Sequence, residues 1–115
     1  MARYDFSDEL LSRIARRFKT LGELSRLQLL IHLINTGEMT VRELVEATGQ
    51  RQANVSKHLN LLAGEDFVAR RKQGLNVYYR IKDPSIQALC TIVCDRLVEQ
   101  SAEERRVLEG MERSG

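Results

Sequence analysis

The chain has 115 residues, of which 43% are hydrophobic and 30% charged, and its formal net charge is +2. These values are typical of a single globular domain over residues 1–115, and the few titratable groups argue against an enzyme. No apolar run approaches the ~18–20 residues of a membrane span, and Met1–Asp5 lacks the apolar core of a secretory signal. We therefore expect a cytoplasmic protein with no membrane segment.

The charge is unevenly distributed along the chain. Residues 1–50 are neutral, residues 51–82 hold seven basic and two acidic side chains, and residues 83–115 have a net charge of −3. A basic middle segment between neutral and acidic ends indicates a surface for a polyanion.

Four helices are predicted before residue 65. Ser7 caps a first helix with an apolar stripe from Leu10 to Phe18, and a second helix covers about residues 23–35, with leucines on more than one face, as in a core helix. Thr40 and Glu43 form a capping box that begins a short third helix. The fourth covers residues 51–63. Gly49 supplies the tight turn between the last two, which is the helix-turn-helix arrangement.

The periodicity then changes to that of strands. Residues 67–72 and 76–81 predict a β-hairpin around Gln73-Gly74-Leu75. Asp83 and Pro84 begin a last helix, with an apolar stripe from residue 86 to 98, and the charged tail from about residue 101 either continues this helix or frays. The predicted fold is mainly α with a β-hairpin wing, in the order α-α-α-α-β-β-α.

A helix-turn-helix followed by a hairpin is a winged helix, which presents its second helix to the major groove and its wing to the adjacent backbone or minor groove. The second helix contains no acid between residues 51 and 64 and offers side chains that suit bases and phosphates. The predicted DNA contacts from this helix are Arg51, Gln52, Asn54, Ser56, Lys57 and His58, and those from the wing are Arg70, Arg71, Lys72, Gln73 and Asn76. A winged helix that docks only proteins is the alternative, and the basic helix argues against it.

The chain resembles the ArsR/SmtB family of winged-helix repressors from about residue 11 to 99. The segments that carry the resemblance are Leu24–Leu30, Thr40–Leu44, Asn54–Leu62 and Arg71–Ile81. The resemblance implies a homodimer through the first and last helices, a double-stranded operator with two-fold symmetry, and an effector that releases the DNA. The long apolar stripe of the last helix independently favours dimerisation.

Two effector sites of the family are not preserved. The metalloid site of its arsenic sensors uses cysteines on the first helix of the helix-turn-helix, and residues 41–47 contain none. At the positions of its last-helix zinc site the chain has Asp83, Ser85, Arg96 and Glu99, so that only two potential ligands remain, beside a repelling cation.

Cys90 and Cys94 remain, one turn apart on one face of the last helix. As thiolates they could chelate a soft metal or metalloid ion, with a third ligand from the partner subunit, His32 or the tail. Redox or reactive-sulfur sensing is a second possibility, because Cys94 matches the second cysteine of the family's persulfide sensors, whose first falls at His32. Simple packing of two small apolar side chains is the third. His32 by itself is typical of a hydrogen-bonded core histidine.

Overall fold

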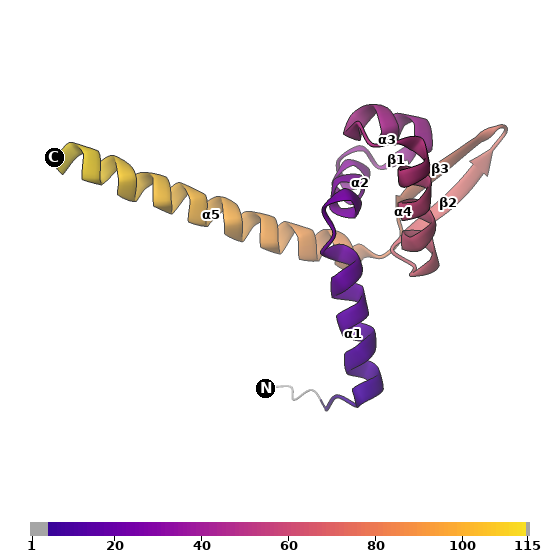
Figure 1. The fold of residues 1–115 in the computed structure, drawn as a ribbon, viewed down its shortest axis with the longest axis horizontal. Coiled ribbons are helices and arrows are strands. Elements are labelled where there is room, and N and C mark those ends of the chain that lie inside the picture. The colour runs from indigo at the N-terminus through magenta and orange to yellow at the C-terminus, as the bar shows by residue number, and fades with distance from the viewer. Residues whose placement is uncertain (1–4, 115) are drawn as a thin grey trace. The chain divides into compact units, whose positions relative to one another are not determined.

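The computed structural model describes the backbone of residues 5–114 and the side chains of residues 5–111. Residues 1–4, where the secretory signal was excluded, and Gly115 lie outside the described residues. The elements are α1 (Asp8–Leu21), α2 (Leu24–Thr36), β1 (Glu38–Thr40), α3 (Val41–Thr48), α4 (Gln52–Gly64), β2 (Val68–Gln73), β3 (Asn76–Ile81) and α5 (Pro84–Ser114) (Figure 1). The predicted order is confirmed, with β1 added to it.

The chain divides into two compact units, Met1–Asp83 and Pro84–Gly115. The first unit holds the whole helix-turn-helix and wing, and α2 lies at its centre as predicted. The core side chains of this unit are Leu21, Leu29, Leu30, Leu33, Met39, Leu44, Val55, Leu59, Leu62, Phe67, Val68 and Tyr79, each less than 10% exposed. Since α2, α3 and α4 all contribute leucines, burial of apolar area holds the two helices of the helix-turn-helix, α3 and α4, in place.

The wing is part of a three-stranded antiparallel sheet with the order β1-β3-β2, whereas a two-stranded hairpin was predicted. The extra strand β1 has only three residues, too few to show a period of two in the sequence. Its central Met39 is buried opposite Tyr79. Gln73 pairs with Asn76, so the loop shortens to two residues, and Gly74 takes the positive φ of 61° that the first position of a II′ turn requires.

The helix ends largely follow the predicted capping residues. The Ser7 hydroxyl accepts a hydrogen bond from the Leu10 amide, and both halves of the Thr40–Glu43 capping box are present. Gly49 is left-handed (φ 73°), and its amide donates to the Val45 carbonyl. α4 ends at Gly64, and Asp66, two residues later, takes a positive φ (62°), a conformation that aspartate tolerates better than most residues.

We expect Thr40→Ala to lower the free energy of unfolding by about 1 kcal/mol, because it removes the acceptor for the Glu43 amide at the start of α3. Urea unfolding followed by circular dichroism measures the loss. Arg42→Ala is the matched control on the same helix, since its exposed ion pair with Glu46 contributes a few tenths of a kcal/mol at most. Equal losses in the two variants would show that the cap does not stabilise α3.

The second unit is the single helix α5, which runs without a break into the charged tail. Pro84 is its first residue, as predicted. Most of its large apolar side chains are exposed in the single chain: Ile92, Val93, Leu97, Val98, Val107, Leu108 and Met111 are each at least 50% exposed. Among the described residues, no helix is both long and apolar enough to cross a membrane.

Candidate nucleic-acid interface

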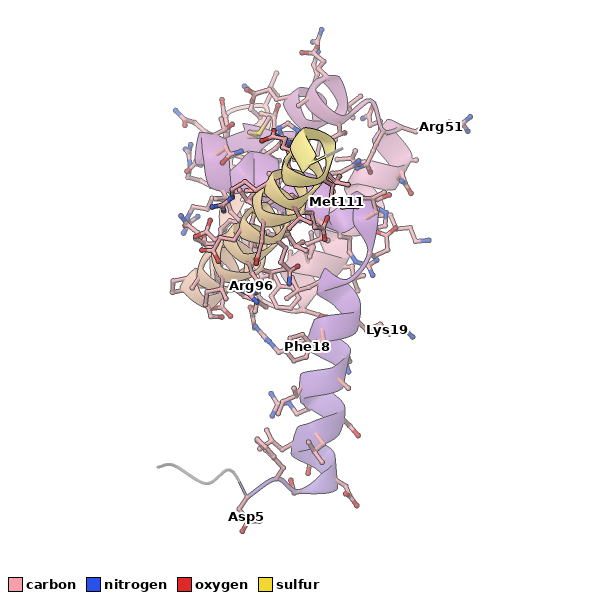
Figure 2. All side chains as sticks on the ribbon, turned by 90° about the vertical axis from the view of Figure 1, so that its left-hand side faces the viewer. Asp5, Phe18, Lys19, Arg51, Arg96 and Met111 are labelled. Carbon is pink, nitrogen blue, oxygen red and sulfur yellow. The ribbon has the colours of Figure 1, made fainter. Side chains whose placement is uncertain are left out.

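The exposed face of α4 carries four of the six residues around this helix that were predicted to contact DNA. Gln52, Asn54 and Lys57 are exposed on it and Ser56 is half-buried, while Val55, Leu59 and Leu62 face the core. Arg51 stands just before the helix as its N-cap residue without a capping side-chain bond, and its side chain extends away from the ribbon (Figure 2). No carboxylate interrupts this surface between residues 51 and 64.

His58, predicted on this exposed face, is buried at 9% exposure. Its Nδ1 lies 3.5 Å from Nη1 of Arg26, and its Nε2 lies 4.0 Å from a carboxylate oxygen of Glu23. The prediction of a DNA-facing His58 is therefore wrong. A sequence signal for this burial does exist, because residues 55, 58, 59 and 62 follow the i, i+3, i+4, i+7 spacing of a core stripe.

The polar contacts of His58 connect α4 to the junction between α1 and α2. Glu23 is the N-cap of α2, and the hydrogen bond from the Arg26 amide is the main cause that lowers the pKa of its carboxyl. The Arg26 guanidinium also donates to the Thr20 carbonyl at 2.7 Å. The inner side of α4 is thus held by polar contacts of His58 in addition to its leucines.

Two glutamines beside α4, Gln28 and Gln50, were not predicted from the sequence. The Gln50 amide nitrogen donates to the Ser25 carbonyl and to Oε1 of Gln28, each at 3.0 Å. Asn54 in turn donates to Oε1 of Gln50 at 3.4 Å. The network orients the Asn54 amide, and with Arg51 and Lys57 it borders a hollow of about 560 Å³ at the start of α4. The spacing of four residues between Gln50 and Asn54 was the sequence signal that could have indicated this contact.

The strand register divides the predicted wing residues between two faces of the sheet. Arg70 pairs with Tyr79 and Lys72 with Val77. Arg70 and Lys72 therefore lie on the same face of the sheet as the buried side chains of Val68 and Tyr79. The opposite face includes Arg71, Gln73 and Asn76, together with Glu38, Tyr78 and Arg80. All five predicted wing residues are exposed, but no flat surface can contact them all at once.

Arg71 is not free, because it forms an ion pair with Glu38 across the middle strand. Its Nη2 and Nε lie 2.7 and 3.4 Å from the two carboxylate oxygens, and its Nη1 donates to the Gln73 side chain. The guanidinium also lies over the Tyr78 ring, 4.9 Å from the centroid. The hydrogen bond between Arg71 and Glu38 lowers the pKa of the carboxyl and raises that of the guanidinium. Without β1, the sequence offered no sign of this partner.

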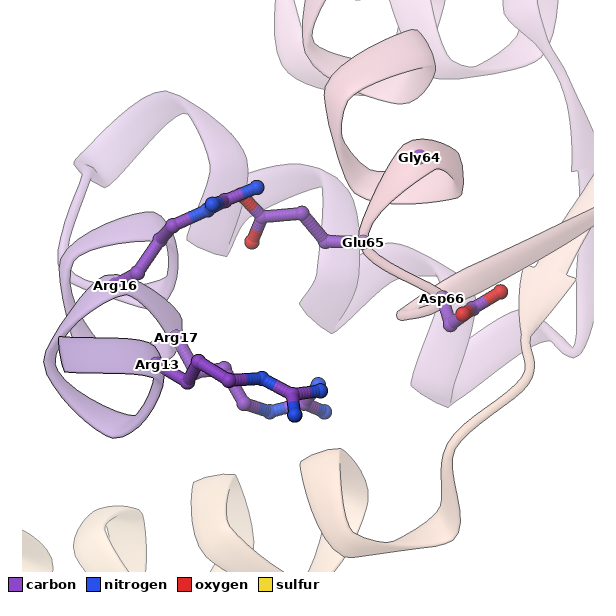
Figure 3. A pocket seen from close by; sticks show the side chains of 6 residues that line it. All are labelled: Arg13, Arg16, Arg17, Gly64, Glu65 and Asp66. Atoms are coloured by element: carbon purple, nitrogen blue, oxygen red, sulfur yellow. The ribbon is translucent and has the colours of Figure 1, made fainter. Parts of the chain in front are cut away.

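Three arginines of α1, Arg13, Arg16 and Arg17, lie near the turn after α4, and two of them form ion pairs. The Arg16 and Arg17 guanidiniums form ion pairs with Glu65 (3.5 Å) and Asp83 (2.7 Å), and Arg17 lies over the Phe67 ring at 4.5 Å. Arg13 lies beside Arg17 at a pocket of about 220 Å³ between α1 and the turn after α4 (Figure 3). These contacts hold α1 against the rest of the first unit.

Both cysteines of α5 are free thiols. Cys90 is half-buried and Cys94 is exposed. Burial, and secondarily the neighbouring Cys94, raises the pKa of Cys90. The described residues contain no group of three His, Cys, Asp or Glu side chains that could hold a metal ion. At two of the positions that match the zinc site of the family's last helix, Arg96 forms an ion pair with Glu99 at 3.7 Å. His32 is half-buried and is not the core residue that was predicted.

A helix-turn-helix with an acid-free outer helix, followed by a wing, defines a winged helix-turn-helix DNA-binding protein. The sequence model of the MarR family matches residues 23–75, from the start of α2 into the turn of the wing. The arsenical resistance operon repressor of Escherichia coli K12 is 37% identical over 78 residues, which are 68% of this chain and 66% of the relative.

Two solved structures cover more of the chain. The antimony-specific repressor AntR has a TM-score of 0.78 at 27% identity and covers 90% of this chain, which in turn covers 92% of AntR. A homodimeric winged helix-turn-helix domain from Mycobacterium bovis, described as possibly ArsR-family, has a TM-score of 0.72 at 31% identity, with 86% and 91% covered. The chain belongs to the ArsR family of winged helix-turn-helix transcriptional regulators. It is a DNA-binding regulator, not an enzyme.

Proposed function

We propose that this regulator is a homodimeric repressor that places α4 in the major groove of a two-fold symmetric operator and is released by an effector. The acid-free exposed face of α4 carries this proposal. Arg51, at the N-cap of the helix, and Gln52 and Asn54 on its exposed face can form hydrogen bonds to base edges. Ser56 and Lys57 can bind phosphate oxygens. On the wing, Arg70 and Lys72 form no ion pair with any described residue and have their charges available. Gln73 and Asn76 can add hydrogen bonds from the opposite face.

Lys57→Ala tests the assignment of α4. Loss of one phosphate contact per subunit is expected to lower the slope of log affinity against log salt by about one per subunit, hence about two for the dimer. Fluorescence anisotropy with a duplex from upstream of the gene measures the slope. Arg106→Ala removes the same charge from the distal part of α5 and should leave the slope unchanged. An unaltered slope for Lys57→Ala would refute the α4 interface.

Dimerisation through the first and last helices is supported by the apolar side chains that a single chain leaves exposed. Leu11 and Phe18 of α1 are 47% and 59% exposed, and the exposed stripe of α5 includes Val93 and Leu97. Exposed apolar area of this extent on two helices favours burial in an interface. The homodimeric state of the Mycobacterium bovis domain agrees with this proposal.

For the effector, we propose a soft metal or metalloid ion bound by Cys90 and Cys94. The similarity to an arsenical resistance repressor and to an antimony-specific repressor supports this ligand class. The two thiols are free and one helical turn apart, so they fit two positions of a thiolate site. The described residues of one chain form no three-ligand group. For an ion that takes three ligands, we propose that the partner subunit or a thiol in solution supplies the third donor.

Oxidation by reactive sulfur is the second candidate effector. The exposure of Cys94 favours it, since an accessible thiol is the one that an oxidant reaches first. A direct disulfide between the cysteines would strain the helix, so a polysulfide bridge or a bond across the dimer fits this candidate better.

A further inference from the structure

The ion pair between Glu38 and Arg71 bears directly on the wing. Glu38 lies on β1 at one edge of the sheet and Arg71 on β2 at the other, with Tyr78 of β3 between them. The register places all three side chains on one face, so the guanidinium reaches the carboxylate across the tyrosine ring. Two carboxylate oxygens and the Gln73 amide oxygen together engage all three guanidinium nitrogens.

This arrangement neutralises Arg71 while leaving it accessible. The two side chains are 44% and 33% exposed, so a DNA phosphate can reach the pair. A phosphate that binds Arg71 has to compete with a carboxylate that already holds the guanidinium by two hydrogen bonds, the geometry in which arginine binds either anion best. Arg70 and Lys72, on the other face, have no such competitor among the described residues.

We propose that Glu38 is a positioning residue for DNA binding, which holds Arg71 back from the phosphates and so lowers the electrostatic strength of the wing contact. The inference rests on the proposed DNA interface. Affinity from phosphate contacts is nearly independent of sequence and depends on the number of cations released. A neutral Glu38–Arg71 pair releases no counterion from the DNA, so the wing binds through fewer charges than its sequence suggests.

The test is Glu38→Gln, which keeps the side-chain shape and removes the competing charge. With a random-sequence duplex as the probe, we expect tighter binding and a salt slope steeper by about one per subunit. The ratio of variant to parent affinity should then fall roughly tenfold between about 50 and 200 mM salt. Glu46→Gln is the matched control, because it removes an exposed carboxylate from α3, where it is paired only with exposed Arg42.

A second pair of variants shows whether the effect acts through Arg71. In an Arg71→Ala background, Glu38→Gln should leave the slope unchanged, since the guanidinium that Glu38 holds by hydrogen bonds is gone. Arg80 lies opposite Glu38 on β3 but forms no ion pair with it among the described residues. Weaker binding by Glu38→Gln, or an unchanged slope, would overturn the proposal. An equal change of the salt slope by Glu38→Gln in the parent and in the Arg71→Ala background would also overturn it. So would the same change of the slope by Glu46→Gln. Lys57→Ala, measured alongside, separates the proposed role of Glu38 from the proposed α4 interface. If Lys57→Ala lowers the salt slope while Glu38→Gln leaves it unchanged, the α4 interface stands and the role of Glu38 fails.

Discussion

A Leu97→Glu variant is expected to be a folded monomer that binds operator DNA roughly 100-fold or more weakly than the parent, since it loses the avidity of two linked DNA-binding units. Leu97 is 57% exposed in the single chain, so the substitution disturbs no core of its own subunit. In a two-fold interface each substitution occurs twice, and two carboxylates would enter one apolar contact without a partner.

Analytical ultracentrifugation and circular dichroism measure the expected change in mass with retained helicity. Gln87→Glu provides the control, because it adds the same charge at an exposed polar position of α5. It should remain dimeric and bind DNA as the parent does. A dimeric Leu97→Glu protein with normal operator affinity would contradict the assignment of this stripe to the interface.

The double variant Cys90→Ser, Cys94→Ser is expected to bind operator DNA normally and to lose release by the effector completely. Serine keeps the size of the side chain and removes the soft thiolate ligand. Release of a fluorescent operator duplex is measured with arsenite, antimonite, Hg(II) and Cu(I), and separately with polysulfide. Release of the double variant by the same agent as the parent would leave the cysteines with a packing role only.

The response should also depend on pH if the effector is a metal or metalloid ion. Because burial raises the pKa of Cys90, this thiol holds its proton at neutral pH, and ion binding has to displace it. The apparent affinity of the parent for the ion should therefore rise with pH until Cys90 ionises by itself. Titrations at several pH values, with the single Cys90→Ser variant for comparison, measure this linkage.

Local features of the sequence were sufficient for the helices and their order. The Ser7 cap, the Thr40–Glu43 capping box and the left-handed Gly49 each act within four residues, so their physics is contained in the sequence. The same is true of the acid-free run after residue 50, from which α4 is predicted to be the helix that faces DNA. Fold class and general function could therefore be predicted before any contact was known.

Which charges are available to DNA was decided only by the tertiary structure. Residues 38 and 71 are 33 positions apart, and their pairing depends on a three-residue strand that has no periodic signal of its own. His58 looked like one more polar residue of α4, but the fold turns it toward Glu23 and Arg26. Composition and periodicity record which charges a chain has, whereas neutralisation and burial depend on neighbours that only folding brings within a few ångströms.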